Sequence, residues 1–168
     1  MLKWLLVLLF FVPSIVNAEI GEISELRGNG EILRKDQTGS LIAKTSLDIL
    51  SYDDVRTGNG RIGITFLDDS IIRLTEHSKI VIDEYIYDPD PSKSKLALNM
   101  ASGTARFITG ALGRINKENI RITTPTATIA IRGTDFTTTV DELGRSLVIL
   151  LPDANGISSG EITVDSFA

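Results

Sequence analysis

Hydrophobic and polar residues alternate with a period of two along nearly the whole chain after residue 18. Short aliphatic and β-branched stretches are separated by Gly, Asn, Asp or Pro about every 8–12 residues, which is the spacing of strands and tight turns. Because no stretch after residue 18 repeats apolar residues at helical spacing for more than about one turn, we expect almost no helix. The predicted strands are 20–27, 30–35, 61–67, 70–75, 79–87, 95–100, 104–109, 120–124, 126–132, 135–140, 146–151 and 161–164.

This pattern predicts an all-β domain of about a dozen short strands in two layers, either a β-sandwich or a short β-helix-like roll. Alternation fits both arrangements, because each buries one face of every strand. The last predicted strand, 161–164, has no evident closing partner in the sequence. Its edge is therefore available for self-association or for a strand from another protein.

The first 18 residues have a different character. Lys3 precedes an unbroken apolar run from Trp4 to Val12, and the segment ends in Val-Asn-Ala at residues 16–18. This order predicts a secretory signal peptide cleaved after Ala18. The alternative, an uncleaved anchor, would need about 20 apolar residues to cross a bilayer, and the run before Pro13 has about half of that. We therefore expect an exported single domain, residues 19–168, with no transmembrane segment after cleavage.

Charge and cysteine content narrow the classes of partner and chemistry. The chain carries 22 acidic and 17 basic side chains, a net charge of −5. Nucleic acid is an unexpected partner, because phosphate binding needs a basic face and no Lys/Arg cluster is visible in the sequence. Cysteine is absent. Disulfide staples, thiolate metal sites and cysteine catalysis are therefore excluded.

The acidic pairs and the single histidine are the candidate chemical sites of the chain. Asp53-Asp54 and Asp68-Asp69 could be paired carboxylates of a glycoside hydrolase, but adjacent acids on extended backbone point to opposite sides and normally form turns. His77 lacks the further ligands that a metal site requires. Asp88 and Asp90 alternate like calcium ligands, but the prolines between and after them break any EF-hand loop. We expect no enzyme activity, no cofactor and no metal site.

The segment 124–136 is the most informative part of the chain. Pro125 disfavours helix at the residue before it, a β-branched run follows, and Gly133 supplies a reversal before the next strand begins. The segment predicts strand, turn and strand, and it contains no catalytic constellation. The residues that carry its motif, with a structural role, are Thr124, Pro125, Arg132, Gly133, Thr134 and Phe136.

Four segments in this order, 53–58, 64–74, 102–107 and 124–136, are similar to the successive motifs of the FecR-type periplasmic domain. The resemblance covers roughly residues 26–150, and it implies a non-enzymatic all-β domain outside the cytoplasm. In sigma-factor regulators such a domain relays the occupied state of an outer-membrane siderophore transporter. Here a predicted signal peptide stands directly before the domain, which indicates a stand-alone exported member. At Asp69 the family pattern usually has Gly.

We accordingly expect a binding or scaffolding module of the bacterial cell envelope, in the periplasm or at the cell surface, with an envelope protein or glycan as partner. The alternative is a structural, adhesin-like segment of a larger surface β protein. Three residues are candidates for partner binding. Arg132 adjoins the turn at Gly133, where it either bonds locally to the turn carbonyls or to Asp135, or receives a partner carboxylate. Tyr85 and Tyr87 share one face of a strand and form the best available aromatic platform.

Overall fold

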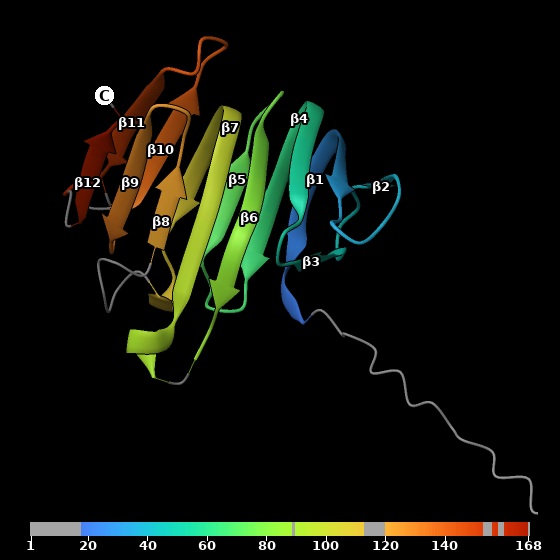
Figure 1. The fold of residues 1–168 in the computed structure, drawn as a ribbon, viewed down its shortest axis with the longest axis horizontal. Helices are drawn as coiled ribbons and strands as arrows, with labels where there is room; N and C mark the ends of the chain where they lie inside the picture. The colour runs from blue at the N-terminus through green and yellow to red at the C-terminus, as the bar shows by residue number, and fades with distance from the viewer. Residues whose placement is uncertain (1–17, 89, 113–119, 153–155, 158–159, 168) are drawn as a thin grey trace, which may run out of the picture.

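The computed structural model describes residues 18–88, 90–112, 120–152, 156–157 and 160–167 (Figure 1). Most of these residues lie in strands, joined by turns and by one short 3₁₀ turn, η1 (Pro91–Lys93). The strands are β1 (Glu19–Leu33), β2 (Ser40–Ile42), β3 (Asp48–Leu50), β4 (Asp54–Phe66), β5 (Ile71–Leu74), β6 (Lys79–Ile86), β7 (Lys95–Ile108), β8 (Ile120–Thr123), β9 (Ala127–Arg132), β10 (Asp135–Val140), β11 (Ser146–Leu151) and β12 (Glu161–Ser166).

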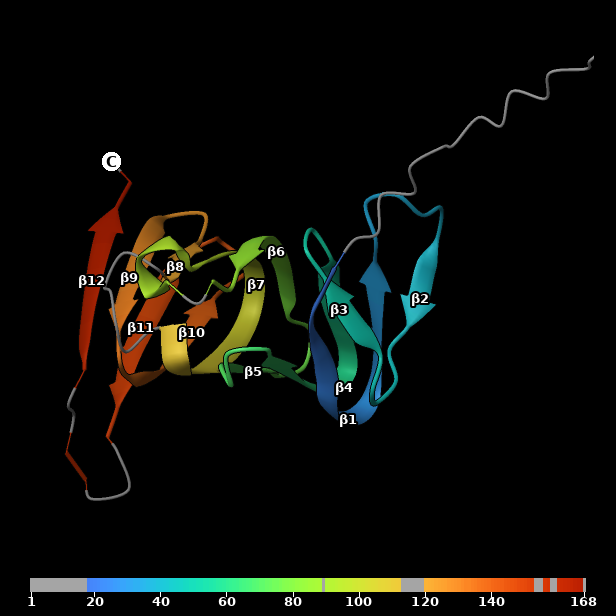
Figure 2. The same ribbon diagram turned by 90° about the horizontal axis from the view of Figure 1, so that it is seen from below.

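Strand pairing divides the fold into two layers. In one layer, which we call the β9 layer, the order is β2, the second half of β1, the first half of β4, β6, the first half of β7, β8, β9 and β12. All of these pairs are antiparallel except β7 with β8, which are parallel. In the other layer, the β10 layer, the order is β3, the first half of β1, the second half of β4, β5, the second half of β7, β10 and β11. Figure 2 shows the two layers from below.

The long strands β1, β4 and β7 belong to both layers, because each bends midway and changes neighbours. In β1 the bend lies at Gly28, which has a φ of 74°, opposite Gly60 of β4. In β7 it lies at Gly103, with a φ of 88°, where a Cβ atom would come within 2.3 Å of the Ser78 hydroxyl oxygen. Only glycine combines that backbone conformation with so close a neighbour. The bends fold one continuous hydrogen-bonded sheet into a sandwich.

The hydrophobic core fills the space between the layers. Alternate residues of each strand point inward, so that Leu98, Ile122 and Ile129 of the β9 layer and Ile72 and Phe136 of the β10 layer are at most 1 % exposed. Ile131 of one layer and Phe136 of the other line the same small internal pocket, which places the two layers face to face. This is the packing expected of an aligned two-layer β protein.

The all-β prediction is confirmed, and the two layers are halves of one folded sheet whose long strands run through both. The sequence interpretation divided β1 and β7 at their glycines, and it omitted β2, β3 and the first half of β4. Residues 1–17 of the predicted signal peptide lie outside the described residues. Within the described part of the chain, no helix has the length and apolar character to span a membrane.

The two ends of the sandwich differ. At the end formed by β2 and β3, the connecting segments close over the core: Ala43 and Ile49 are buried, Ala43 N donates to Gly30 O, and Ser46 N donates to Ile23 O. At the opposite end the last strands are β11 and β12, each of which pairs with a single described strand. Figure 2 places β12 at the outer left, at the far end from the start of β1.

Candidate interaction surface

The motif segment forms a turn that is fastened by side-chain hydroxyls. The Thr124 hydroxyl is buried, accepts from Ala127 N at 3.0 Å and receives a hydrogen bond from Ser146 Oγ at 2.7 Å. Thr126 Oγ1 donates to Gly144 O at 3.1 Å. These bonds connect the turn between β8 and β9 to the loop before β11. Thr124 is therefore a hydrogen-bonding residue of this turn.

Gly133, with a φ of 57°, joins β9 to β10. The two strands do not pair with each other: β9 pairs with β8 and β12, and β10 pairs with β7 and β11. The reversal predicted at Gly133 is thus a corner that carries the chain from one layer to the other. Thr134 and Phe136 are both buried directly after it.

The predicted local pair of Arg132 with Asp135 is wrong. Asp135 is held instead by Arg106 of β7 in a bidentate ion pair, with Arg106 Nε 3.1 Å from Oδ1 and Nη2 on Oδ2. The guanidinium of Arg132 is about half exposed and lies 3.8 Å from a Glu161 carboxylate oxygen of β12. Since Arg106 and Asp135 belong to paired strands, sheet register decided this pairing. Arg132 remains an exposed cation on the β9–β12 surface.

The predicted tyrosine platform is wrong for Tyr85, because this side chain is buried. Tyr85 is only 8 % exposed, stacks on Phe66 with ring centroids 5.4 Å apart, and donates its hydroxyl hydrogen to Asp68 Oδ1 at 3.4 Å. Burial, together with the nearby Asp68 charge, raises the pKa of Tyr85. Tyr87 follows the end of β6 and is 53 % exposed. Tyr87 alone is available to a partner.

Asp68 organises the turn between β4 and β5. This buried carboxylate accepts hydrogen bonds from Ser70 N at 3.2 Å, Ser70 Oγ at 2.6 Å and Leu112 N at 3.1 Å, in addition to the Tyr85 hydroxyl. Asp69, its neighbour, is exposed and has a φ of 63°. This left-handed backbone suits the Gly that the family pattern usually has at position 69, and both aspartates shape the turn.

Asp53 and Asp54 have equally different surroundings. Asp53 is 1 % exposed, accepts from Leu50 N at 2.9 Å, and lies 3.4 Å from Arg34 Nε. Burial raises the pKa of Asp53, and the hydrogen bond and the Arg34 charge oppose that rise. Asp54 instead faces Arg56 at 2.8 Å and Lys79 at 3.4 Å. The two carboxylates therefore have separate partners and do not form a paired site.

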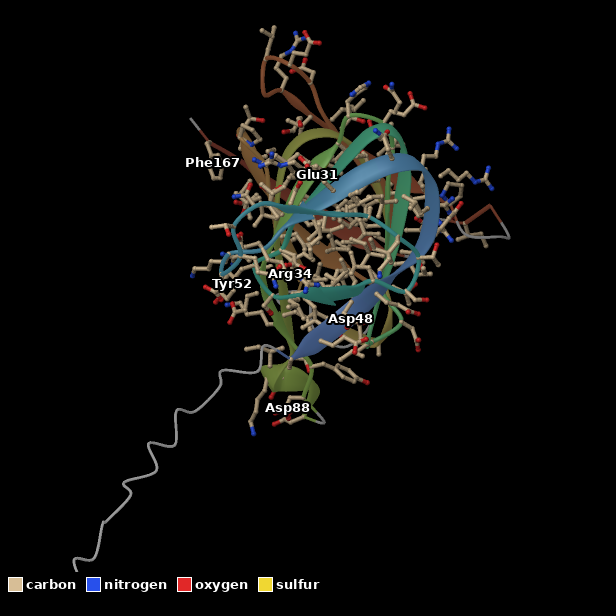
Figure 3. The ribbon with its side chains drawn as sticks, turned by 90° about the vertical axis from the view of Figure 1, so that its right-hand side faces the viewer. Glu31, Arg34, Asp48, Tyr52, Asp88 and Phe167 are labelled. Atoms are coloured by element: carbon tan, nitrogen blue, oxygen red, sulfur yellow. The ribbon has the colours of Figure 1, made fainter. Side chains whose placement is uncertain are left out.

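A small pocket opens beside Arg34, lined by Arg34, Lys35, Asp36, Gln37, Leu50, Ser51, Tyr52 and Asp53. Figure 3 looks onto this end of the sandwich, where Arg34 lies between Tyr52 and Asp48. Arg34 donates to Asp48 O at 2.6 Å, and the Lys35 ammonium lies 4.7 Å from the Tyr52 ring centroid. Because Arg34 and Lys35 already have partners within the domain, we interpret the pocket as part of the structure that closes this end of the sandwich.

The remaining polar candidates are turn residues. Asp88 Oδ1 accepts from Asp90 N at 2.8 Å and Asp90 Oδ1 accepts from Ser92 N at 3.1 Å, so both carboxylates shape the loop around η1. His77 is exposed in a turn with a φ of 54°. Among the described residues, no group of three or more acidic, histidine or cysteine side chains is arranged to hold a metal ion.

The end of the sandwich formed by β11 and β12, here called the open end, carries exposed aliphatic side chains on both strands. On β11, Leu147 is 57 %, Ile149 46 % and Leu150 36 % exposed, and on β12 Val164 is 48 % exposed. Phe167, just after β12, is 54 % exposed. β11 contains no charged residue. Large apolar side chains gathered along two sheet edges are typical of a surface that another chain covers.

A second surface lies on the outer face of the β10 layer. Arg61, Arg73 and Arg106 line a groove together with Glu25 and Gly63, and the neighbouring Arg27 lies opposite Arg61 in the strand register. Arg73 Nε is 3.6 Å and Arg27 Nε 3.3 Å from the carboxylate of Glu25. The sequence did not predict this cluster, because the four arginines lie on four different strands. Only cross-strand register brings them together.

Comparison with known proteins gives one match. The sequence model of the FecR protein family matches residues 53–152. No curated protein and no solved structure matches the chain at a significant level. The matched segment starts at Asp53, later than the predicted residue 26, and ends one residue after β11, so that β1–β3 and β12 lie outside it. Because the match spans more than half of the sequence, the chain belongs to the FecR family.

Proposed function

We propose that this chain is a non-enzymatic, exported binding module of the bacterial cell envelope that recognises a partner protein through its open end. Membership of the FecR family supports an envelope role related to signalling, because the family resemblance implies a domain outside the cytoplasm. The observation that carries the proposal is the aliphatic surface along β11 and β12.

Two physical arguments support a protein partner at this surface. Exposed strand edges with aliphatic side chains tend to associate, and monomeric proteins usually protect them with charges, prolines or bulges. β11 has none of these protections over its six residues, Ser146–Leu151. The opposite end of the sandwich, by contrast, is closed by the segments around β2 and β3.

The acidic residues support binding rather than hydrolysis. Asp53 and Asp68 are buried in hydrogen bonds that shape turns, and Asp54 is paired with cations. Inverting and retaining glycosidases need two carboxylates about 5–10 Å apart across an open sugar cleft. The contacts of these aspartates suit the framework of a binding domain.

Affinity capture from the native envelope fraction tests the proposal, with residues 19–168 as bait. The test variant is Ile149→Lys, which places a charge on β11, and the matched control is Ile42→Lys at the closed end, where Ile42 is 84 % exposed. We expect an envelope protein that the wild type and Ile42→Lys recover and Ile149→Lys loses. Equal recovery by both variants would place binding elsewhere. Recovery of only the bait itself, as higher oligomers, would favour the structural, adhesin-like alternative.

The arginine groove supports a second candidate function, binding of an acidic envelope glycan. Arg61 has no acidic partner among the described residues, and guanidinium groups suit carboxylate and phosphate recognition. Titration with an acidic polysaccharide such as polygalacturonate should give salt-dependent binding that Arg61→Gln weakens. Binding unaffected by Arg61→Gln would remove this candidate. Arg145→Gln, at an exposed arginine in the loop before β11, provides the matched control.

A further inference from the structure

The two layers have different numbers of strands at the open end. Beyond β7, which both layers share, the β9 layer continues through three strands, β8, β9 and β12. The β10 layer continues through only two, β10 and β11. The β9 layer therefore extends one strand further, and β12 overhangs the edge of β11. Figure 2 shows this offset, with β12 at the outer left and β11 set further in.

The overhang leaves the inner face of β12 without an opposing strand in the described part of the chain. Ile162 and Val164 pair with Ile131 and Ile129, whose side chains are buried, so both face the interior side of the sheet. Val164 is nevertheless 48 % exposed. On the other side, Leu150 lies opposite the buried Phe136 and is still 36 % exposed. Interior positions on both strands are thus partly exposed at the open end.

We propose that the strand-sized space bordered by the edge of β11 and the inner face of β12, here called the β11 slot, binds one extended segment of a partner protein as an added strand of the β10 layer. This inference rests on the proposed function and specifies how the partner docks. The added strand would pair with the main chain of β11 and cover Val164 and Ile162. It would give both layers the same number of strands at this end.

A second copy of the chain does not fit this space through its own β11. If two β11 strands paired side by side, each β12 would overhang into the position that β9 of the other copy occupies, because β12 extends one strand beyond β11. A strand that enters without an overhanging layer avoids that clash. The described N-terminal end of the chain lies at the opposite end of the sandwich (Figure 2) and so does not reach the slot.

The lining residues define the chemistry of the added strand. Its inward-facing residues would contact Val164, Ile162 and Leu150, so they are aliphatic, and a charged residue there would be buried without a partner. Its outward-facing residues would lie beside Leu147 and Ile149, which pair with threonines of β10. Threonine or valine would fit at these outward positions. β11 pairs with β10 over six residues, which sets the length. Main-chain hydrogen bonds would supply most of the affinity, as in other strand-addition complexes.

Hydrogen exchange with a defined probe tests the mode of binding. The probe is the soluble peptide Lys-Lys-Thr-Val-Thr-Val-Thr-Val-Lys-Lys, added at millimolar concentration to residues 19–168. We expect slower exchange of those β11 amides that do not bond to β10, with β12 unchanged. The same peptide with N-methyl groups on alternate residues should give no protection, because it cannot complete the ladder. Protection of β12 in place of β11, or no protection of either, would overturn the proposal.

Variants separate this inference from the proposed function. Val164→Lys, a change at a half-exposed side chain, should weaken peptide binding at least about tenfold by placing a charge in the slot. Ile42→Lys should not change it. In the envelope capture experiment, a partner lost by Ile149→Lys but kept by Val164→Lys would overturn strand addition and leave the binding function standing. A partner insensitive to both variants would overturn the proposed function itself. Circular dichroism should verify that each variant is folded.

Discussion

The ring of Phe136 stacks on the ring of Phe107 with centroids 4.8 Å apart and planes inclined by 7°. The two residues lie directly opposite each other on β10 and β7, and both face the core. This pair joins the motif segment that identifies the family to the long strand that both layers share. Its contribution to stability can be measured.

Phe136→Ala should lower the free energy of unfolding by about 3–5 kcal/mol, because it removes a fully buried aromatic side chain and leaves a cavity. Chemical denaturation of residues 19–168 measures the change. Phe167→Ala, at an exposed aromatic, is the control and should have little effect. A loss below about 1 kcal/mol for Phe136→Ala would contradict its place in the core.

Thr138→Val should raise the free energy of unfolding by about 1 kcal/mol. Thr138 is fully buried, and among the described residues its hydroxyl has no hydrogen-bond partner, so the substitution removes an unsatisfied polar group. The neighbouring Thr139→Val is the matched control. It should not stabilise, because the Thr139 hydroxyl bonds to that of Thr104 at 2.9 Å. Thermal unfolding that shows equal effects for both variants would contradict this account.

Asp69→Gly should stabilise the protein by roughly 0.5–1 kcal/mol, because it relieves a left-handed backbone conformation at a residue with a φ of 63°. Asp69→Ala removes the same carboxylate but keeps the Cβ atom, and should give no gain. The comparison of midpoints in urea distinguishes backbone relief from the loss of a negative charge. A similar gain in both variants would point to charge.

Titration of Asp53 should lower the free energy of unfolding as the pH rises above about 4. Burial raises its pKa in the folded protein above the usual value of 3.8, so the folded state binds the proton more tightly than the unfolded state does. Its contribution is then present below the unfolded pKa and is lost as the pH rises through the folded pKa. Urea denaturation across this range should show wild type losing stability relative to Asp53→Asn.

The comparison with Asp53→Asn is needed because other carboxylates act in the opposite sense. Hydrogen bonds with Arg145 lower the pKa of Asp141, and those with Ser92 lower the pKa of Asp90. Their contributions are present above the unfolded pKa and are lost as the pH falls. If the stability difference between wild type and Asp53→Asn stays constant with pH, Asp53 does not titrate as its burial implies.

Alternation predicted the strand content because it depends only on neighbouring residues. It predicted Tyr85 and Tyr87 on one face of a strand, but Tyr85 is buried in the core and Tyr87 lies beyond the end of β6. Glycine was interpreted as a break at Gly28 and Gly103, where the structure uses it as a bend inside a continuous strand. Local pattern does not distinguish these two uses.

The pairing of strands that are far apart in the sequence could not be predicted either, because local pattern carries no information about it. The sequence places Asp135 three residues from Arg132, but β7 brings Arg106 to it from 29 positions away. The open end was only partly anticipated: the edge of the last strand was predicted, and the strand mismatch between layers was not. A mismatch of that kind appears only when each strand has been assigned to a layer.

Because β1, β4 and β7 run through both layers, neither layer can slide or separate from the other without breaking three ladders at once. The domain should consequently lose its structure in a single cooperative step, and a strand bound at one end should tighten the whole body instead of opening a hinge. Under the proposed function, partner binding at the open end would hold the domain in place without changing its shape.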